Sequence, residues 1–393
     1  MDIEIQRGQE PVELDEARQG KAREYARIKR RLSFVGLGIS ASGIVLLLFS
    51  GLGIWLRDVL QNSGWLSWQP VTGWYPLQLL AYFLIIYLIY EVITTPLSYY
   101  SGYTLPHRYQ LSTLSMKGWL GDVAKSLVLG LILEVVIIEL MYALLAFQPA
   151  SWWLWVGLIM IFFSVVMANL APVLIMPIFY KFQPLPEGEL TGRLLALMQR
   201  AHTHVRGVFT MRLSDKTTAA NAALMGLGNT RRIVIGDTML DKYTPDEIEV
   251  VLAHELGHHV HHDIWKALLS QSVLLLGGLY LANLAFHLVV EAQHLYQGFA
   301  DPATLPFLFA LFGVFGLFIM PLSNGLSRIA EYQADEYALQ ATSKVTAFKS
   351  AMTRLANQNL SDVEPSPIIE FLFYSHPSIQ KRLRHADEFA QRE

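Results

Sequence analysis

Six long apolar runs constrain this chain more than any other feature, because each is long enough to cross a bilayer as a helix. A hydrocarbon core about 30 Å thick needs roughly 20 apolar residues at the rise of an α-helix. Of the 393 residues, 53% are hydrophobic and only 16% are charged. The sequence therefore predicts a mainly α, polytopic membrane protein. The expected spans are 34–56, 76–98, 124–147, 152–175, 266–290 and 304–324.

Lysine and arginine are concentrated in alternate connections, and this bias predicts the orientation of the spans. The tail before residue 32 and the segment 181–264 are rich in both, whereas the 57–75 loop has only Arg57 and the 291–303 loop has none. Six spans with both termini and the catalytic domain in the cytoplasm fit this bias. The membrane would be the cell membrane in a bacterium and the endoplasmic reticulum in a eukaryote. The acidic and then basic tail is expected to lie on an anionic membrane surface.

The spans divide the chain into five expected parts. These are a cytoplasmic tail (1–32), a region of four spans (33–181), a catalytic domain (182–264), a hairpin of two spans (265–325) and the rest of the catalytic domain (326–393).

A metal-binding pattern lies in the catalytic segment. His254, Glu255 and His258 form H-E-x-x-H, and Thr244 followed by Pro245 and two acids gives a helix start before them. Histidines four residues apart project from one helical face and can bind one zinc ion, with the glutamate as general base on water. The alternative is a polar helix with surface histidines.

The expected third ligand is Glu331, because a catalytic zinc usually holds three protein groups. Asp335 lies one turn further on and can orient a ligand histidine through its other ring nitrogen. The alternative is a solvated helix face. The two spans between His258 and Glu331 form a hairpin, which returns both residues to the same membrane surface.

Segment 182–264 also predicts a small α+β unit of zincin type. A breaker-rich linker (182–188) precedes a helix at about 187–204, and 208–213 and 232–235 are expected strands. Between them, 219–228 is an expected edge strand that could take an extended substrate by strand addition. A plain structural strand is an equal alternative.

Further short segments, taken together, resemble one family. They are Ala171–Leu174, 182–190, Asn221–Ala222 with Gly226, 231–238, the zinc motif, Ser327–Asp335, and Ser375–Pro377 with Arg382. In this order they resemble the M48 integral-membrane zinc metallopeptidases, most closely the Ste24-type CAAX prenyl proteases. The resemblance covers about 170–390, and the chain departs from that group in having six expected spans where seven are usual.

The resemblance implies roles for individual residues. His254, His258 and Glu331 would bind one zinc ion, with Glu255 as general base and Asp335 orienting a ligand histidine. His376 would stabilise the oxyanion. Asn221, Ala222 and Arg382 would contact substrate.

The implied substrate is a C-terminal CaaX-type peptide or protein, prenylated or not, cut within the membrane lipid environment. Two alternatives stay open: HtpX-like quality control of misfolded membrane proteins, and a catalytically silent scaffold or transporter. A net charge of −3 gives no reason to expect nucleic acid.

Ionisable residues also occur within the expected spans, at Glu91, Glu134, Glu139 and His287. They face a hydrated chamber if the family resemblance holds. The alternative is that Glu91 and the Glu134/Glu139 pair lie near span ends or pair with Asn169 or Asn283.

Overall fold

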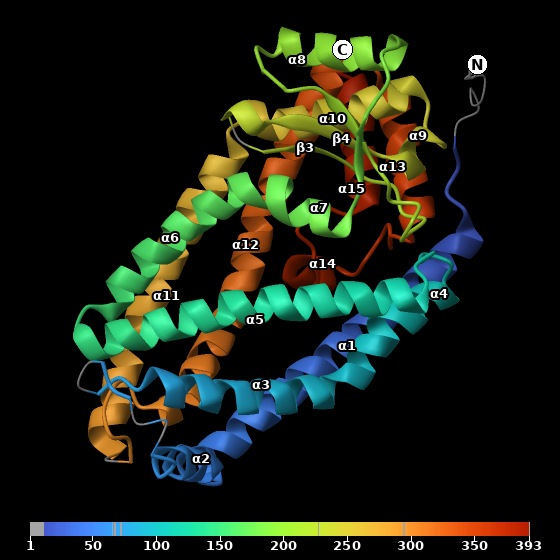
Figure 1. The fold of residues 1–393 in the computed structure, drawn as a ribbon. Coiled ribbons are helices and arrows are strands. Elements are labelled where there is room, and N and C mark those ends of the chain that lie inside the picture. The colour runs from blue at the N-terminus through green and yellow to red at the C-terminus, as the bar shows by residue number, and fades with distance from the viewer. Residues whose placement is uncertain are drawn as a thin grey trace.

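The computed structural model describes residues 12–392, except residues 65, 67, 71, 72, 227 and 294. Among these residues, six helices are long and apolar enough to cross a membrane, which confirms the expected number of spans. They are built on α1 (Glu16–Phe49), α3 (Pro76–Tyr99), α5 (Met116–Phe147), α6 (Trp152–Leu170), α11 (Asp263–Gln293) and α12 (Leu305–Thr342). Figure 1 shows these helices splaying from a compact unit that contains the sheet.

The first span differs from its expected bounds of 34–56. Helix α1 begins at Glu16 and ends at Phe49, where Gly51 adopts a left-handed φ of 79° and turns the chain into α2 (Leu52–Gln61). Helix α2 has 10 residues and is therefore about 15 Å long, roughly half the thickness of a bilayer core, so it does not cross the membrane. The basic segment before residue 32, expected as a separate tail, instead continues into the first span as one helix. Residues 1–11 of that tail lie outside the described residues.

Prolines change the helical pitch near the ends of two spans. Helix α3 contains Pro96 and passes through a π-helical turn (Tyr100–Thr104) into α4 (Leu105–Arg108). Helix α6 passes through a second π turn (Ala171–Ile175) into α7 (Met176–Phe179). Proline lacks the amide proton and clashes with the preceding turn, so a local change of hydrogen-bond register is expected there. The second and fourth spans therefore remain helical beyond their expected ends at 98 and 175, to Arg108 and Phe179.

Helices α11 and α12 form the predicted hairpin, but α12 extends well beyond the expected end at 324. It continues without a break to Thr342 and carries Glu331 and Asp335 into the compact unit that contains the sheet. This unit is formed by the two parts of the expected catalytic domain (182–264 and 326–393), and we call it the catalytic unit. One continuous helix thus contains both a membrane span and a segment of the site. The positions of Glu331 and Asp335 follow from membrane packing and from the core of the catalytic unit together.

The sheet is small and mixed. Its order is β1–β2–β4–β3, from β1 (Phe182–Pro184), β2 (Val208–Met211), β4 (Arg232–Gly236) and β3 (Ala222–Met225). Strand β2 is parallel to β4, and β1 and β3 are antiparallel to their neighbours. The edge strand expected at 219–228 exists but is confined to β3, and Leu227 within that range lies outside the described residues. Strand β1 was not expected, because Pro184 and Pro186 favoured a linker.

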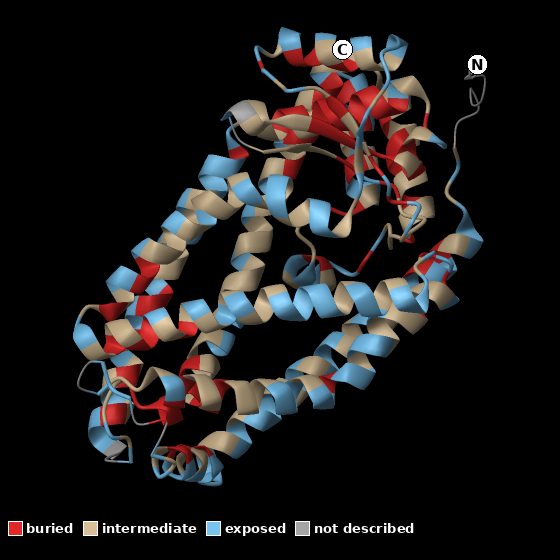
Figure 2. Cartoon of the chain, viewed as in Figure 1, coloured by how far each residue is buried: buried red, intermediate tan, exposed pale blue. Residues whose placement is uncertain are grey.

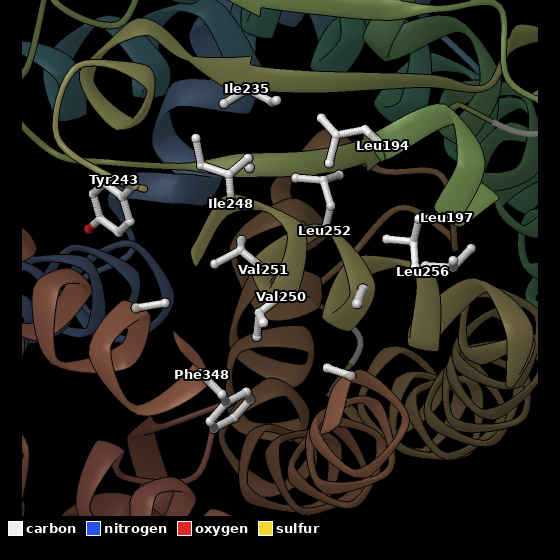
Figure 3. Close-up of a cluster of buried hydrophobic side chains, with 14 of the residues drawn as sticks. Leu194, Leu197, Ile235, Tyr243, Ile248, Val250, Val251, Leu252, Leu256 and Phe348 are labelled. Atoms are coloured by element: carbon white, nitrogen blue, oxygen red, sulfur yellow. The ribbon is translucent and has the colours of Figure 1, made fainter. Parts of the chain in front are cut away.

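Helices pack on the sheet and bury the core of the catalytic unit. These are α8 (Glu189–Arg200), α10 (Pro245–Val260), α13 (Val345–Asn359) and α15 (Ile379–Ala390), with the short α9 (Asp237–Leu240) and α14 (Pro367–Phe373) at the periphery. Figure 3 shows Leu252 of α10 beside Leu194 of α8, and Leu256 beside Leu197. Ile235 and Leu252 are completely buried.

Burial is concentrated at the two ends of the molecule. Figure 2 shows buried residues gathered in the catalytic unit and again near α2, while the long helices between them are mostly half-buried or exposed. Large apolar side chains such as Phe162 and Leu288 are more than two thirds exposed on the spans. Such surfaces are stable only in contact with lipid.

Two of the ionisable residues within the spans, Glu139 and His287, have partners other than the two asparagines considered from the sequence. Glu139 accepts a hydrogen bond from Trp74 Nε1 at 3.2 Å. His287 bonds to Glu291 and to the carbonyl of Pro149 near the span end, both at 3.1 Å. Asn283 instead accepts from Trp152 Nε1 at 2.7 Å.

An ion-pair cluster ties α8, α10 and the start of α13 together and predicts sensitivity to acid. Lys344 Nζ lies 2.7 Å from both Glu249 and Asp246, and Arg193 bonds to both carboxylates. Burial raises the pKa of Glu249, but hydrogen bonds from Lys344 and Arg193 outweigh this effect and lower its pKa overall. A lowered carboxylate pKa stabilises the fold above the unfolded value of about 4.3, and that stability is lost as the pH falls through the folded value.

Replacement of Glu249 with Gln should therefore lower the free energy of unfolding at pH 7 by about 1–3 kcal/mol. The difference from the parent chain should shrink below about pH 4, where the parent carboxylate also becomes protonated. Melting temperatures in detergent across this pH range provide the measurement, with the exposed Glu189→Gln as control. A difference that does not change with pH would rule out this linkage.

Candidate active site

The two motif histidines are displayed by α10, whose start is fixed by local sequence. Thr244 caps the helix and accepts from the amide of Glu247, while the Glu247 side chain accepts from the Thr244 amide in return. This capping box and the proline that follows set the helical register from the first turn. The rings of His254 and His258, one turn apart, lie 4.9 Å apart in an edge-to-face arrangement.

Close packing of α10 on α12 brings Glu331 to these histidines. A Cβ added at Gly257 would lie 2.9 Å from the Cα of Ala334, so only glycine permits this approach of the two backbones. Glu331 Oε2 lies 3.3 Å from His254 Nε2, and Oε1 lies 3.4 Å from His258 Nε2. The three residues expected as ligands therefore converge, with potential ligand atoms within 4.8 Å of one another.

A second layer of carboxylates holds both imidazole rings. Asp335 lies 2.9 Å from His254 Nδ1, and Asp263 lies 3.0 Å from His258 Nδ1. A carboxylate at Nδ1 fixes the tautomer that leaves Nε2 free to bind a metal. Asp335 was expected from the sequence, but Asp263 was not. The sequence feature that could have indicated Asp263 is an acid at the first residue of the helix after the motif. His262, just before it, turns the chain with a left-handed φ of 59°.

Arg382 lies behind the metal group, although the sequence suggested a contact with substrate. Its side chain is only 8% exposed, and its Nε donates to Asp335 Oδ2 at 2.8 Å. A second guanidinium nitrogen also bonds to Asp335, and Nη1 lies 3.8 Å from Glu331. The expectation of a substrate contact is therefore corrected. The physical reason is that a buried guanidinium needs a carboxylate partner, and α15 presents Arg382 to Asp335.

The carboxylates around His254 make the site attractive to a cation. Burial lowers the pKa of His254, but hydrogen bonds with Asp335 and Glu331 raise it overall to about 9. The charges that attract a proton also attract a metal ion, and a metal must displace that proton on binding.

The donor set fits a divalent metal ion. Glu331 Oε2 is buried, and the polar atom facing it is His254 Nε2 at 3.3 Å, so the two atoms face the same space, as two ligands of one cation would. Two imidazoles and one carboxylate also match the ligand set of catalytic metal sites that keep one position open. No other group of this kind occurs in the described part of the chain.

Glu255 and His376 lie on the accessible side of this group. Glu255 and His258 line a cavity of about 690 Å³. His376 precedes α15, and its Nε2 lies 3.1 Å from Glu331 Oε1 while its other ring nitrogen contacts the Ser375 hydroxyl at 3.0 Å. The His376 side chain is 60% exposed. Both residues are thus at the group, and their expected roles stay predictions.

The edge strand β3 borders the same cavity. Leu224 and Gly226 contribute to the cavity wall, and no strand of the described residues pairs with the outer side of β3. Asn221, just before the strand, is exposed, while Ala222 is buried against the sheet. The Asn359 side chain holds the approach to β3 by bonding both the amide and the carbonyl of Ala220, at 2.8 and 3.1 Å. The free edge is thus held in place from α13.

The rest of the cavity wall comes from the membrane hairpin. Side chains of α11 and α12 line it, including Ile264, Ala267, Leu326, Ile329 and Ala330. The cavity also has basic side chains, Arg231 and Lys266, and most of its surface is apolar. A hydrolytic site thus opens directly onto the ends of two spans.

Comparison with known families agrees with both halves of the chain. A family model described as peptidase family M48 matches residues 184–390. A model described as the CAAX prenyl protease N-terminal region with five membrane helices matches residues 11–181. Within the second region the described residues contain four candidate spans, and α2 is a shorter fifth helix.

Individual relatives extend over most of the chain. The uncharacterized metalloprotease YhfN of Bacillus subtilis is 30% identical over 371 residues, which are 93% of this chain and 85% of that protein. CAAX prenyl protease 1 of Saccharomyces cerevisiae is 30% identical over 320 residues, 77% of this chain and 70% of that protein. The crystal structure of S. mikatae Ste24p has the same fold, with a TM-score of 0.82 and 24% identity over 96% of this chain and 90% of that one.

Proposed function

This chain belongs to peptidase family M48 and is a membrane metallopeptidase, and on that premise we propose that it removes the C-terminal tripeptide from prenylated CaaX-type substrates, using one zinc ion. The observation that carries the proposal is the shared cavity, in which Glu255 and His258 meet apolar side chains of the two spans α11 and α12. A substrate that combines a peptide with a lipid needs both kinds of surface in one place.

Zinc would be held by His254, His258 and Glu331, whose donors suit this ion. When bound, it would polarise the scissile carbonyl and make water acidic enough to lose a proton near neutral pH. Asp335 and Asp263 orient the two imidazoles. Arg382 acts through Asp335 as a positioning residue, because its guanidinium is buried away from the cavity.

Glu255 is the general base of the proposed reaction. It takes a proton from the attacking water and delivers it to the amine that leaves. His376 donates from its exposed ring to the oxyanion that develops on the carbonyl oxygen, a contribution of about 2.7–4 kcal/mol when such a donor is preorganised. Asn221 and the backbone of Ala222 hold the extended substrate beside the edge strand β3.

The distribution of lysine and arginine supports a cytoplasmic position for the catalytic unit and both termini. The membrane is then the cell membrane in a bacterium or the endoplasmic reticulum in a eukaryote. We retain the division of the chain at 32, 181, 264 and 325, although α1, α11 and α12 cross three of these positions as continuous helices.

The test compares a farnesylated CaaX peptide with its unprenylated twin. Detergent-purified protein with a measured zinc content would be incubated with each peptide, and mass spectrometry would identify the products. Glu255→Ala serves as the inactive control. We expect release of the last three residues from the prenylated peptide by the parent chain only.

Equal cleavage of both peptides would show that the lipid is not recognised and would favour an HtpX-like role on misfolded membrane proteins. A zinc-loaded protein that cuts neither peptide would reject the CaaX assignment. A protein that purifies with a different metal, and cleaves the peptide with that metal alone, would show that zinc is not the catalytic ion.

A further inference from the structure

The first turns of α1 are held against the catalytic unit on the side away from the proposed metal site. Arg18 Nε donates to the carbonyl of Asn357 at 2.7 Å, and the Asn357 amide donates to the carbonyl of Glu13 at 2.9 Å. Ala22 is completely buried in a cluster with Tyr109 and Leu360. Figure 1 shows the start of α1 lying beside α4, the end of the second span. The start of α1 is therefore packed as a fixed part of the fold, and a pocket lies where it meets α4.

This contact encloses a pocket of about 180 Å³ with a strong excess of positive charge. Its wall contains the three basic side chains of Arg18, Lys21 and Arg108, and Glu24 is its one acid. None of the three basic residues forms an ion pair within the described part of the chain. Three cations beside one carboxylate make this pocket attractive to an anion, and Lys21 and Arg108 are exposed and therefore hydrated when no anion is bound.

A buried hydroxyl points to the same conclusion. Tyr109 also lines the pocket and is 8% exposed, and its hydroxyl makes no hydrogen bond of good geometry among the described residues, although the Glu24 carboxylate lies within its reach. The Glu24 carboxylate lies near enough to help raise the pKa of this phenol, after the larger effect of burial. An unpaired buried hydroxyl costs about 1–3 kcal/mol, so a ligand oxygen that accepts its proton would be favoured.

Two helix ends form the backbone of the pocket. Gln110 and Leu360, which also line it, adopt left-handed φ values of 57° and 50°. Leu360 is the C-cap of α13 and Gln110 follows the end of α4, and a left-handed residue is common at such helix ends. A neighbouring groove of about 430 Å³ shares Arg18 and Gln110 and adds Lys242, which extends the positive surface toward the catalytic unit.

We infer that this pocket binds a phosphate group, and its position favours the phosphate of an anionic membrane phospholipid. Its residues come from the basic extension of α1 before the apolar part of the first span and from the residues that follow the apolar part of the second, so it lies on the side of the bilayer from which these two spans emerge. Basic clusters next to spans bind anionic headgroups. Arg108 and Arg18 would pair with the phosphate oxygens, and the Tyr109 hydroxyl would donate to one of them.

The test measures lipid binding to the delipidated full chain by native mass spectrometry. The probes are short-chain phosphatidylglycerol, short-chain phosphatidylcholine and inorganic phosphate. Arg108→Gln removes a charge and Tyr109→Phe removes only the hydroxyl. Arg23→Gln is the matched control, because Arg23 is an exposed cation on α1, the helix of Arg18 and Lys21, and does not line the pocket.

We expect one phosphatidylglycerol to bind, with affinity about fivefold weaker in Arg108→Gln and about tenfold weaker in Tyr109→Phe, and unchanged in Arg23→Gln. Competition by inorganic phosphate as effective as the lipid would support the phosphate site and identify free phosphate as its ligand. Equal affinity for phosphatidylcholine, equal weakening by Arg23→Gln, or no bound lipid would each overturn the inference.

Discussion

Glu255→Gln is expected to lower kcat about 10²–10⁴-fold while the protein keeps its metal. Glu255 lines the catalytic cavity beside His258 but is not among the three groups whose donor atoms converge. A glutamine of nearly the same shape cannot accept the proton of water, so the chemical step is slowed and metal binding is not. The measurement is kcat on a cleaved peptide together with metal content per chain.

A matched substitution separates this effect from a general loss of structure. Glu189→Gln changes the same residue type on α8, where the side chain is 84% exposed and its ion pair with Arg193 is long, at 3.8 Å. This variant should retain parental activity. If Glu255→Gln lost its metal, or if both variants lost activity equally, the role of Glu255 as a base would be wrong.

Much of the metal group could be predicted because its geometry is local or topological. The spacing of His254 and His258 is fixed by the helical period, and the capping box fixes where that helix begins. Glu331 followed from a different argument: a hairpin of two spans must return to the surface it left. Neither step requires knowledge of how distant side chains pack.

Asp263 and Arg382 were missed or misplaced for the opposite reason. Asp263 reaches His258 only because the backbone reverses at His262, and a left-handed turn at a histidine has no clear sequence signal. Arg382 lies on α15, and its contact with Asp335 depends on how α15 packs against α12. Sequence patterns indicate which face of a helix is apolar, but they do not specify which partner a buried charge will find.

The bounds of the spans likewise depend partly on local sequence and partly on packing between distant segments. Apolar content located all six, yet α1 and α12 extend well beyond their apolar parts. Their polar ends remain helical because they pack on the catalytic unit: Ala22 and Ala334 are completely buried there. Hydropathy measures transfer into lipid, so it cannot detect a helix that leaves lipid and enters a protein core.

Asp335→Ala is expected to lower the free energy of unfolding by about 3–5 kcal/mol, in addition to weakening metal binding 10–100-fold. Asp335 has no exposed surface and contacts both His254 Nδ1 and the guanidinium of Arg382. Its removal leaves Arg382 as an uncompensated charge in the core, with only Glu331 as a distant partner at 3.8 Å. Melting in detergent and metal titration measure the two effects.

Asp263→Ala provides the contrast that assigns these effects to their causes. Asp263 makes the equivalent contact with His258, but its other partner, Lys266, is 59% exposed and remains hydrated without it. This variant should therefore lose 10–100-fold in metal affinity while the metal-free protein loses about 1 kcal/mol or less. If the two variants destabilised the metal-free protein equally, Arg382 would not be the source of the larger loss. If neither weakened metal binding, the carboxylates would not orient the imidazoles.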